Sequence, residues 1–474
     1  MAQPQARINR RDFLKLMGTF ASVAGASVAV TACAPEQVPG PDPTRVVPPV
    51  VDSTSVPPEP VLPPVPLGII ALNRMGFGPR PGDFDAFNLL GGTDDERLRA
   101  YVAQQLNPDS IDDSDFEARY NAAGFETLHK TQEELYFDHI ANNPYDSNDD
   151  AYWDWYSKPA HELVDATFLR AVYSKKQLVE VLADFWHNHF NVYFWQDDGV
   201  PLLVSYNRDV LRKHMFGNFR QMLEAIATHP SMLYYLNQNN SSDAGPNENF
   251  ARELFELHTL GAENYLGVRD PNTVEKDANG IAIGYVDNAP DQLKRVVEVI
   301  LLSPEFRGSW GAKIKRPIEA AISIMRTLNA DFTRLPGGIP WMCSMMGQPI
   351  FERRPPDGYP DVKEAWANSM SLLYRWNFAV GISENWMDDE EQGRIIRTDI
   401  LGQTPVEIRT AESLADFWIP RLLNRTMSEA DRQAVISVMA QDHGPQDELD
   451  QDHINWVLPA MVEVILMSPD FQWK

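Results

Sequence analysis

Residues 159–189, PAHELVDATFLRAVYSKKQLVEVLADFWHNH, carry the clearest structural pattern of the chain. Apolar side chains recur there at spacings of three and four residues, which is the period of a helix with one buried face. The residues that form the pattern are Leu163, Phe168, Ala171, Val172, Leu178, Val181, Leu182 and Phe185. This stretch therefore predicts a helical core.

The same period appears along residues 208–228, and end signals mark two further helices. Pro317 opens a predicted helix over residues 318–328, because proline is tolerated in the first helical turn. Ser428 opens another helix that runs to residue 439, since this serine and the acidic residue three positions later form a capping box.

Strand signals are few, and the strongest covers residues 281–286, after a turn-like sequence. We therefore predict a mainly α fold. It consists of one large multi-helix domain over residues 67–474, with long irregular connections and at most a small β-hairpin. A chain of 474 residues is long enough to bury such a core.

An internal repeat links two distant parts of the chain. Residues 296–306 recur as residues 461–471, with eight of the eleven positions identical. Each copy is an apolar helix that ends at Ser-Pro, because proline disfavours helix in the residue before it. A fainter third copy over residues 223–232 places His229 where the other copies have serine. We therefore predict a reused helix-and-stop element, with His229 in a turn.

The net charge of the chain argues against one class of binding partner. There are 41 Lys and Arg residues against 67 Asp and Glu residues, a formal net charge of −26. A surface this negative repels phosphate backbones, so we expect no nucleic-acid partner. The simplest interpretation of the acidic excess is a well-solvated surface.

The N-terminus predicts export. Residues 9–15, NRRDFLK, resemble the twin-arginine motif, with Arg10 and Arg11 as the arginine pair. Residues 16–32 are uncharged but too short and too weakly apolar for a stable membrane span, which is the alternative interpretation. We therefore predict a signal peptide over residues 1–32 that sends the protein out of the cytoplasm already folded.

A lipid anchor is predicted next to the signal peptide. Residues 30–33, VTAC, resemble a lipobox, which makes Cys33 the lipidated residue, although the same residues also suit an ordinary signal peptidase. Residues 33–66 contain twelve prolines and form a predicted semi-rigid tether. We therefore expect a membrane-anchored lipoprotein of the cell envelope, periplasmic or on the cell surface. The second cysteine, Cys343, then has no partner for a disulfide.

Residues 184–190, DFWHNHF, place two histidines in apolar surroundings. His187 and His189 point the same way only if the backbone is extended, and an extended pair is a common metal-ligand arrangement. On a helix they diverge by about 200°. The alternative is a pair of core histidines that bind backbone carbonyls.

Residues 247–261, NENFARELFELHTLG, predict a helix with a second polar cluster. Its four-residue spacing of Glu, Arg and Glu is also that of a plain ladder of surface ion pairs. Glu253 and His258 lie at opposite margins of the apolar stripe, about 140° apart, so a metal shared with the histidine pair uses only one of them. The candidate catalytic residues are Glu253, Arg252 and His258.

Familiar catalytic motifs are absent. We find no phosphate-binding Gly-rich loop, no G-x-S-x-G elbow and no haem-attachment site. His161 and Glu162 begin the zinc motif H-E-x-x-H, but Asp165 stands where the second histidine is needed. Residues 275–286 half resemble a calcium loop and lack its closing carboxylate.

At the two polar segments the chain resembles the bacterial family called domain of unknown function eighteen hundred. The motifs that carry the resemblance are residues 185–190, FWHNHF, and residues 246–249, 252–254 and 256–261. Further matches are residues 73–79, 217–219, 303–306, 313–317 and 347–351. Together they span most of residues 67–474.

The resemblance implies an exported, largely helical protein, often encoded beside members of the family numbered fifteen hundred and one. It implies no settled activity. Family members usually continue after the His-Thr-Leu-Gly motif with an Ala-Arg and a Thr-Gly-Trp segment, which the short stretch 262–295 of this chain lacks. If that segment completes a site, the site is lost or altered here.

Two hypotheses follow. In the first, the protein is an exported metal-dependent hydrolase: His187, His189 and Glu253 bind a divalent metal, Glu253 can instead act as general base, and Arg252 holds an anion. In the second, it is a non-catalytic surface lipoprotein, a scaffold or assembly partner of another exported protein. The family numbered fifteen hundred and one is the expected source of that partner.

Overall fold

The computed structural model describes residues 64–474, except 197–198, 243–244, 246 and 260–288. The described residues lie within one folded unit that begins at Pro60. They form twenty α-helices, and their β-pairing is limited to isolated bridges. The prediction of a mainly α domain is confirmed. The signal peptide, Cys33, almost all of the tether and the strand predicted over residues 281–286 lie outside the described residues.

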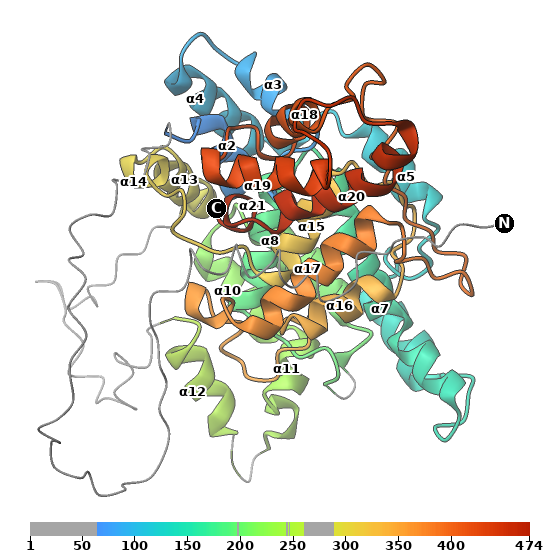
Figure 1. Cartoon of the computed structure of the whole chain (residues 1–474). Helices are drawn as coiled ribbons and strands as arrows, with labels where there is room; N and C mark the ends of the chain where they lie inside the picture. Colours follow the sequence, from blue (N-terminus) through green and yellow to red (C-terminus); the bar gives the residue numbers. More distant parts are fainter. Residues whose placement is uncertain (1–63, 197–198, 243–244, 246, 260–288) are drawn as a thin grey trace, which may run out of the picture. The chain divides into compact units, whose positions relative to one another are not determined.

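Figure 1 shows the helices in chain order. The first half contains α2 (Leu67–Arg74), α3 (Asp83–Asn88), α4 (Asp94–Gln105), α5 (Ser114–Ala122), α6 (Gln132–Tyr136), α7 (Asp150–Tyr173), α8 (Gln177–His189), α9 (Leu203–Ser205), α10 (Phe219–Thr228), α11 (Pro230–Tyr235) and α12 (Glu248–Glu256). The second half contains α13 (Gln292–Leu301), α14 (Pro304–Arg307), α15 (Pro317–Thr327), α16 (Gly338–Met345), α17 (Ser369–Ser383), α18 (Ala411–Leu423), α19 (Glu429–Ala440), α20 (Gln451–Met467) and α21 (Pro469–Gln472). Short 3₁₀ turns cover Pro108–Ser110, Gln238–Asn240 and Lys363–Ala365, and π-helical turns cover Phe137–Ala141 and Tyr206–Arg212.

Residues 159–189 belong to two helices, α7 and α8. The chain turns between them because Asp113 binds the turn: its carboxylate accepts the Ser174 hydroxyl at 2.6 Å and the Lys175 amide at 2.7 Å. This side-chain contact to the backbone competes with continued helix. The turn lets α8 pack back against α7.

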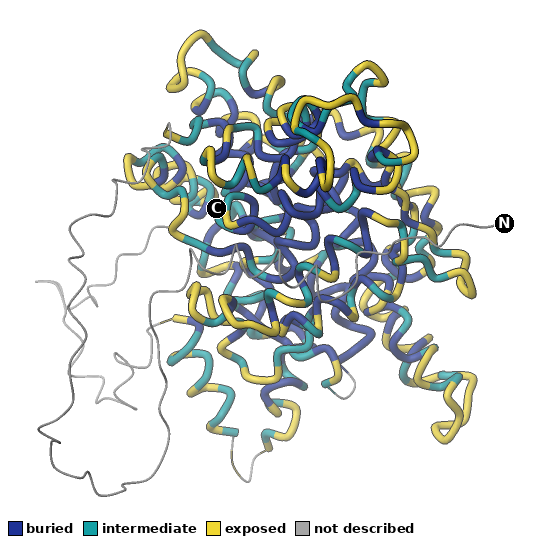
Figure 2. The backbone as a smooth tube through the Cα atoms, in the orientation of Figure 1, coloured by how far each residue is buried: buried dark blue, intermediate teal, exposed yellow. Residues whose placement is uncertain are grey.

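Helix α15 lies at the centre of the fold. Every one of its residues is buried, and it contacts α7 on one side and α17 on the other. Figure 2 shows this interior in dark blue, surrounded by partly exposed segments. The predicted helix that starts at Pro317 is therefore confirmed, and its burial on all sides identifies it as a core helix.

The C-terminal part of the chain forms a helical bundle. Helix α20 packs against α17, α18 and α19, and α18 packs against α19. Ser428 caps α19, because its hydroxyl accepts the Asp431 amide at 3.1 Å, but the Asp431 carboxylate accepts the Ser428 hydroxyl, so the full capping box that was predicted does not form. This bundle covers the α17 side of α15.

The helix predicted over residues 208–228 is interrupted. A π-helical turn ends at Arg212, and α10 begins only at Phe219. The cause is Asn218, whose side chain accepts the amides of Arg220 and Gln221 and so caps α10. Apolar spacing alone does not reveal this restart, because the pattern continues across it.

All three copies of the repeat form the predicted helix-and-stop element. In the two strong copies α13 leads into α14 and α20 leads into α21, with a serine before the proline each time. In the third copy α10 leads into α11, and His229 occupies the turn, where its Nδ1 accepts the Ser231 amide at 3.2 Å. The prediction that His229 is a turn residue is confirmed.

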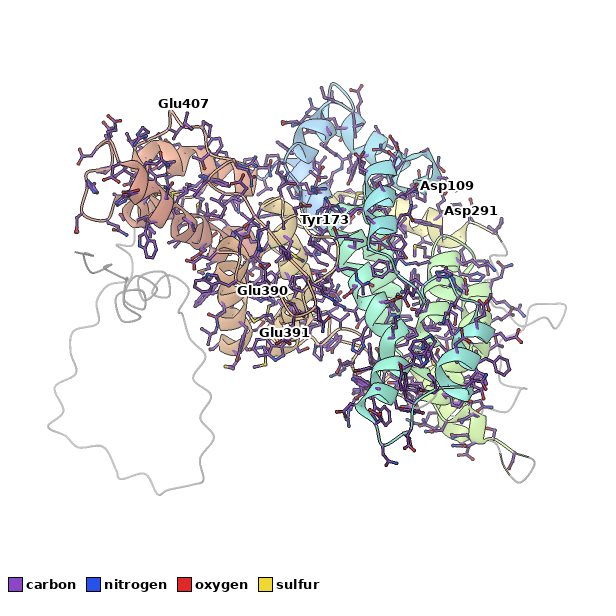
Figure 3. The ribbon with its side chains drawn as sticks, turned by 90° about the vertical axis from the view of Figure 1, so that its right-hand side faces the viewer. Asp109, Tyr173, Asp291, Glu390, Glu391 and Glu407 are labelled. Atoms are coloured by element: carbon purple, nitrogen blue, oxygen red, sulfur yellow. The ribbon has the colours of Figure 1, made fainter. Side chains whose placement is uncertain are left out.

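The acidic side chains labelled in Figure 3 lie at the surface of the described unit. Asp109, Asp291, Glu390, Glu391 and Glu407 are all exposed. Burial of the free Cys343 thiol raises its pKa to about 12. Among the residues that the structure describes, no helix is both long enough and apolar enough to cross a membrane.

The buried Glu463 of α20 makes stability depend on pH. Burial, assisted by the nearby Glu384, raises the pKa of this carboxyl from 4.5 to about 8. Between these values the folded chain holds a proton that the unfolded chain releases, so the free energy of unfolding falls as the pH rises. We therefore expect the stability of Glu463→Gln, relative to that of the native protein, to be higher at pH 9 than at pH 5. Urea unfolding at both pH values measures it.

The repeat provides the control for this experiment. Glu298 occupies the same position in the other strong copy and is exposed. The difference in unfolding free energy between Glu298→Gln and the native protein should be the same at both pH values. A difference for Glu463→Gln that does not change with pH would contradict the assignment.

Candidate functional site

The first predicted polar segment lies on α8, which stays helical through His189. His187 and His189 therefore point in different directions, as the helical alternative requires. The His187 ring lies 4.2 Å from the Phe351 ring, centroid to centroid, and the side chain is only 3% exposed. Neither of its ring nitrogens has a hydrogen-bond partner among the described residues. Burial lowers the pKa of His187 to about 3, so the ring is neutral.

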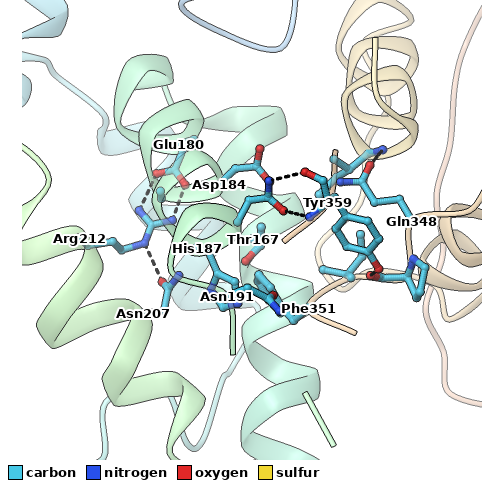
Figure 4. A pocket seen from close by; sticks show the side chains of 15 residues that line it. Thr167, Glu180, Asp184, His187, Asn191, Asn207, Arg212, Gln348, Phe351 and Tyr359 are labelled. Atoms are coloured by element: carbon cyan, nitrogen blue, oxygen red, sulfur yellow. Dashed lines mark hydrogen bonds and ion pairs between the residues drawn. The ribbon is translucent and has the colours of Figure 1, made fainter. Parts of the chain in front are cut away.

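The space beside His187 is small. It has a volume of about 30 Å³ and is lined by paired groups (Figure 4). Arg212 binds Glu180 and Asn207 on one side, and Asn188 binds the backbone of Tyr359 on the other. A cavity of this size admits water but no substrate. We conclude that His187 is part of the core.

The asparagines of the same segment hold a loop in place. Asn188 donates to the Tyr359 carbonyl at 2.9 Å and accepts the Tyr359 amide at 2.6 Å. Asn191 donates to the carbonyls of Arg353 and Pro355. Gly358 has a φ of 69° and sits so close to the Asn188 carbonyl that a Cβ would lie 2.0 Å from it. The segment therefore clamps residues 351–359 to the end of α8.

His189 lies next to His258. Their ring centroids are 5.8 Å apart, and His258 also contacts Phe190. Burial lowers the pKa of both histidines, that of His258 to about 4. Two neutral rings in contact form an apolar junction between α8 and the end of α12.

The remaining candidates on α12 form ion pairs. Arg252 binds Glu256 at 3.3 Å, which is one rung of the ladder that four-residue spacing predicts, and it also binds the adjacent Glu253 at 2.6 Å. Its guanidinium also donates to Asn249 at 2.7 Å. The catalytic roles assigned to Arg252, Glu253 and His258 stay predictions.

The structure does not bring the predicted metal ligands together. His187 faces Phe351, His189 faces His258, and Glu253 pairs with Arg252. The physical reason is that α8 is helical where a shared site needs an extended backbone. Within the described residues, no group of three or more His, Cys, Asp or Glu side chains is placed to hold a metal ion.

A much larger polar cavity lies elsewhere, against α7. Its volume is about 540 Å³, within the range of small-molecule sites. We call it the α7 cavity; its wall includes Asp154, Lys158, His161, Glu162 and Asp165 of α7, Trp341 and Ser344 of α16, and Phe194, Arg334, Glu352, Gln392 and Arg394. It combines apolar, aromatic, acidic and basic side chains from distant parts of the chain.

The floor of the α7 cavity is a buried ion cluster. Asp165 is buried, and its Oδ2 lies 3.0 Å from Arg334 Nε and 3.3 Å from Arg394 Nη1. Burial raises the pKa of Asp165, while the two arginines act in the opposite direction. Glu162 accepts the Thr127 amide and hydroxyl at 2.8 and 2.7 Å. These bonds fix the floor, because each buried charge has a partner.

Two titratable groups face the cavity with altered pKa values. His161 is exposed at the cavity, but desolvation by the protein around its ring lowers its pKa, with Asp154 opposing, so the neutral form dominates at pH 7. Burial raises the pKa of Glu352, against a hydrogen bond from Trp195, so this carboxyl keeps its proton to a higher pH than an ordinary glutamate. The His161 ring is held 5.3 Å from Phe194 and 6.1 Å from Trp195, between centroids. A neutral imidazole and a carboxyl of raised pKa are side chains of the kinds that acid–base catalysis uses.

The sequence carries one signal for this cavity, on α7. His161, Glu162 and Asp165 stood out as an incomplete zinc motif. Their spacing of three and four residues places them on one side of α7, whatever the ligand. Arg334, Glu352 and Arg394 had no such signal, since only the tertiary fold brings them to α7.

The comparison with known proteins agrees with the family resemblance that the sequence motifs indicate. The model of a family described as protein of unknown function DUF1800 matches residues 70–270 and 268–473. No curated protein and no solved structure matches the chain. The matched residues include all of the α7 cavity and both polar segments. The chain belongs to the DUF1800 family.

Proposed function

We propose that this protein is an exported, membrane-tethered hydrolase that works outside the cytoplasm through the α7 cavity. The observation that carries the proposal is that one wide cavity is lined by both His161, whose ring is neutral, and Glu352, whose carboxyl has a raised pKa. Titratable groups with shifted pKa values that share a cleft mark a candidate functional site.

Each residue has a role in this proposal. His161 accepts a proton from the attacking water, and Glu352 donates a proton to the leaving group. Arg394 lines the cavity and stabilises negative charge that develops on the substrate. Asp165 holds Arg394 and Arg334 in position.

The donor set of the cavity does not suit a divalent metal. His161 and Asp165 are spaced as metal ligands would be, but the Asp165 carboxylate is bound by two arginines. Their positive charges repel a cation from the oxygen it needs. The proposal therefore uses no metal-dependent step.

Export and anchoring belong to the same proposal. Arg10 and Arg11 supply the export signal, and Cys33 carries the lipid. Several acyl chains on one cysteine give the stable anchoring that a single chain does not. The proline-rich tether then holds the folded unit away from the membrane.

Mutation of the proposed acid and base tests the hydrolase. We expect the purified full chain to cleave at least one member of a panel of 4-nitrophenyl esters, phosphates and glycosides. His161→Ala and Glu352→Gln should each lower kcat by roughly a hundredfold to ten-thousandfold, the usual share of a general acid or base. His443→Ala, at an exposed histidine outside the cavity, is the matched control.

A chelator provides a second measurement on the same protein. Treatment with EDTA should leave turnover unchanged. The hydrolase assignment is wrong if no substrate of the panel is cleaved, or if turnover is equal in the native protein and both cavity variants.

Fractionation of cells tests the proposed location. The double variant Arg10→Lys, Arg11→Lys should stay in the cytoplasm, because the export route reads the arginine pair. Cys33→Ala should be exported but found in the soluble fraction, because it has no site for the lipid. A Cys33→Ala protein that stays with the membranes would show that something other than the lipid anchors the chain.

Exposed apolar side chains on helix α13 support a second proposed function. Val299 and Ile300 are 71% and 57% exposed, whereas the equivalent Val464 and Ile465 in the other strong copy are buried at 9% and 0%. Exposed apolar patches often mark interaction surfaces. The alternative proposal is a non-catalytic scaffold that binds an exported partner through α13, with the family numbered fifteen hundred and one as the expected source.

A pull-down from solubilised membranes tests the scaffold. Val299→Asp should lose a partner that the native protein retains, because a buried unpaired charge opposes docking. Val406→Asp is the control, since Val406 is a still more exposed valine outside α13. A partner retained by Val299→Asp would exclude α13 as its binding surface.

A further inference from the structure

The α7 cavity has an aromatic wall that acid–base chemistry does not require. Trp341 of α16 lines the cavity and is 56% exposed, although its large apolar rings favour burial. Trp195 does not itself line the cavity but lies against His161, which does. Phe194, fully buried, completes the wall behind the histidine. Exposed tryptophan faces beside hydrogen-bonding groups suit a ligand that is apolar on one face and polar at its edges.

Four charged side chains of the cavity already have ion-pair partners inside the protein. Lys158 pairs with Glu126, and Asp165 pairs with both arginines of the floor. A ligand with a full charge would compete with these pairs and gain little. Groups such as Ser344 and Gln392 in the same wall offer neutral hydrogen bonds instead.

We infer that the α7 cavity binds a neutral saccharide, with the sugar ring stacked on Trp341 and its hydroxyls bound by the polar wall. A pyranose ring has C–H groups on its faces and hydroxyls at its rim, which is the chemistry that this wall matches. The volume of about 540 Å³ exceeds what a single small solute fills and suits part of an oligosaccharide chain.

The inference rests on the proposed hydrolase function and names its substrate class. Hydrolysis would add water across the C–O bond between two sugars: the anomeric carbon takes the hydroxyl, and Glu352 protonates the departing oxygen. The proton released by the water passes to His161. After one turnover Glu352 is ionised and His161 is protonated, so proton exchange with solvent must return the proton to Glu352 and remove it from His161 before the next cycle.

Tryptophan fluorescence and calorimetry on the detergent-solubilised full chain test the inference. The ligands are cellohexaose, maltohexaose and chitohexaose, with hexagalacturonate as the charged comparison. We expect at least one neutral hexasaccharide to bind, and hexagalacturonate to bind more weakly. Trp341→Ala should weaken binding about fivefold, since an aromatic stacking contact contributes about 1 kcal/mol and 1.4 kcal/mol is a factor of ten.

The chain supplies a matched control. Trp456 of α20 is also 56% exposed but does not line the cavity, so Trp456→Ala should bind like the native protein. Binding of no neutral hexasaccharide, preference for hexagalacturonate, or equal loss in both tryptophan variants would overturn the inference. Native folding of each variant is checked by its urea unfolding curve.

The experiment separates this inference from the proposed function. Saccharide binding that Trp341→Ala weakens, without any cleavage, leaves a saccharide-binding protein and removes the hydrolase. Cleavage of 4-nitrophenyl esters that depends on His161, without binding of any hexasaccharide, keeps the hydrolase and removes the saccharide. Binding retained in Glu352→Gln together with lost cleavage supports both.

Discussion

The fold depends on one buried carboxylate, Glu319, at the start of α15. Its Oε1 lies 2.9 Å from Lys474 Nζ and 3.1 Å from Arg316 Nη2, and the same arginine pairs with Asp184 of α8. Burial alone would raise the pKa of Glu319, but Lys474 and Arg316 hold it well below its ordinary value. Breaking such a pair leaves a buried charge without a partner, which costs about 3–5 kcal/mol. The network therefore ties α8, α15 and the C-terminal residue into one unit.

The other end of α15 supports the helix that carries the α7 cavity. Arg326 donates to the carbonyls of Ala171 and Val172, which α7 leaves unpaired at its C-terminal end. The same guanidinium binds the Gly78 carbonyl at 2.6 Å and Asp83 at 2.9 Å. A site on a helix that is fixed by such bonds holds its side chains in defined positions. The candidate site is thus held by α15 although no residue of α15 lines the cavity.

The sequence predicted the helices better than it predicted the site. Apolar period and cap residues identified the α7–α8 stretch, α15 and α19, because these depend on local spacing. The repeat shows the limit of local information: Val299 and Val464 occupy the same position of nearly the same helix, yet one is exposed and the other buried. Burial is decided by what packs against a helix. For the same reason, spacing could place His161 and Asp165 on one face but could not supply Arg334, Arg394 or Glu352.

The FWHNHF segment, residues 185–190, supports the loop that carries Phe351 and Glu352. Phe351 has a φ of 61°, a conformation that costs a bulky residue roughly 1–2 kcal/mol. Contact with the His187 ring, a hydrogen bond from the Phe194 amide at 2.7 Å, and the asparagine clamp on the following residues offset that cost. The next residue is Glu352, which lines the α7 cavity. A segment that looks like a metal site from its histidines is therefore, in physical terms, the support that sets the backbone of the proposed acid.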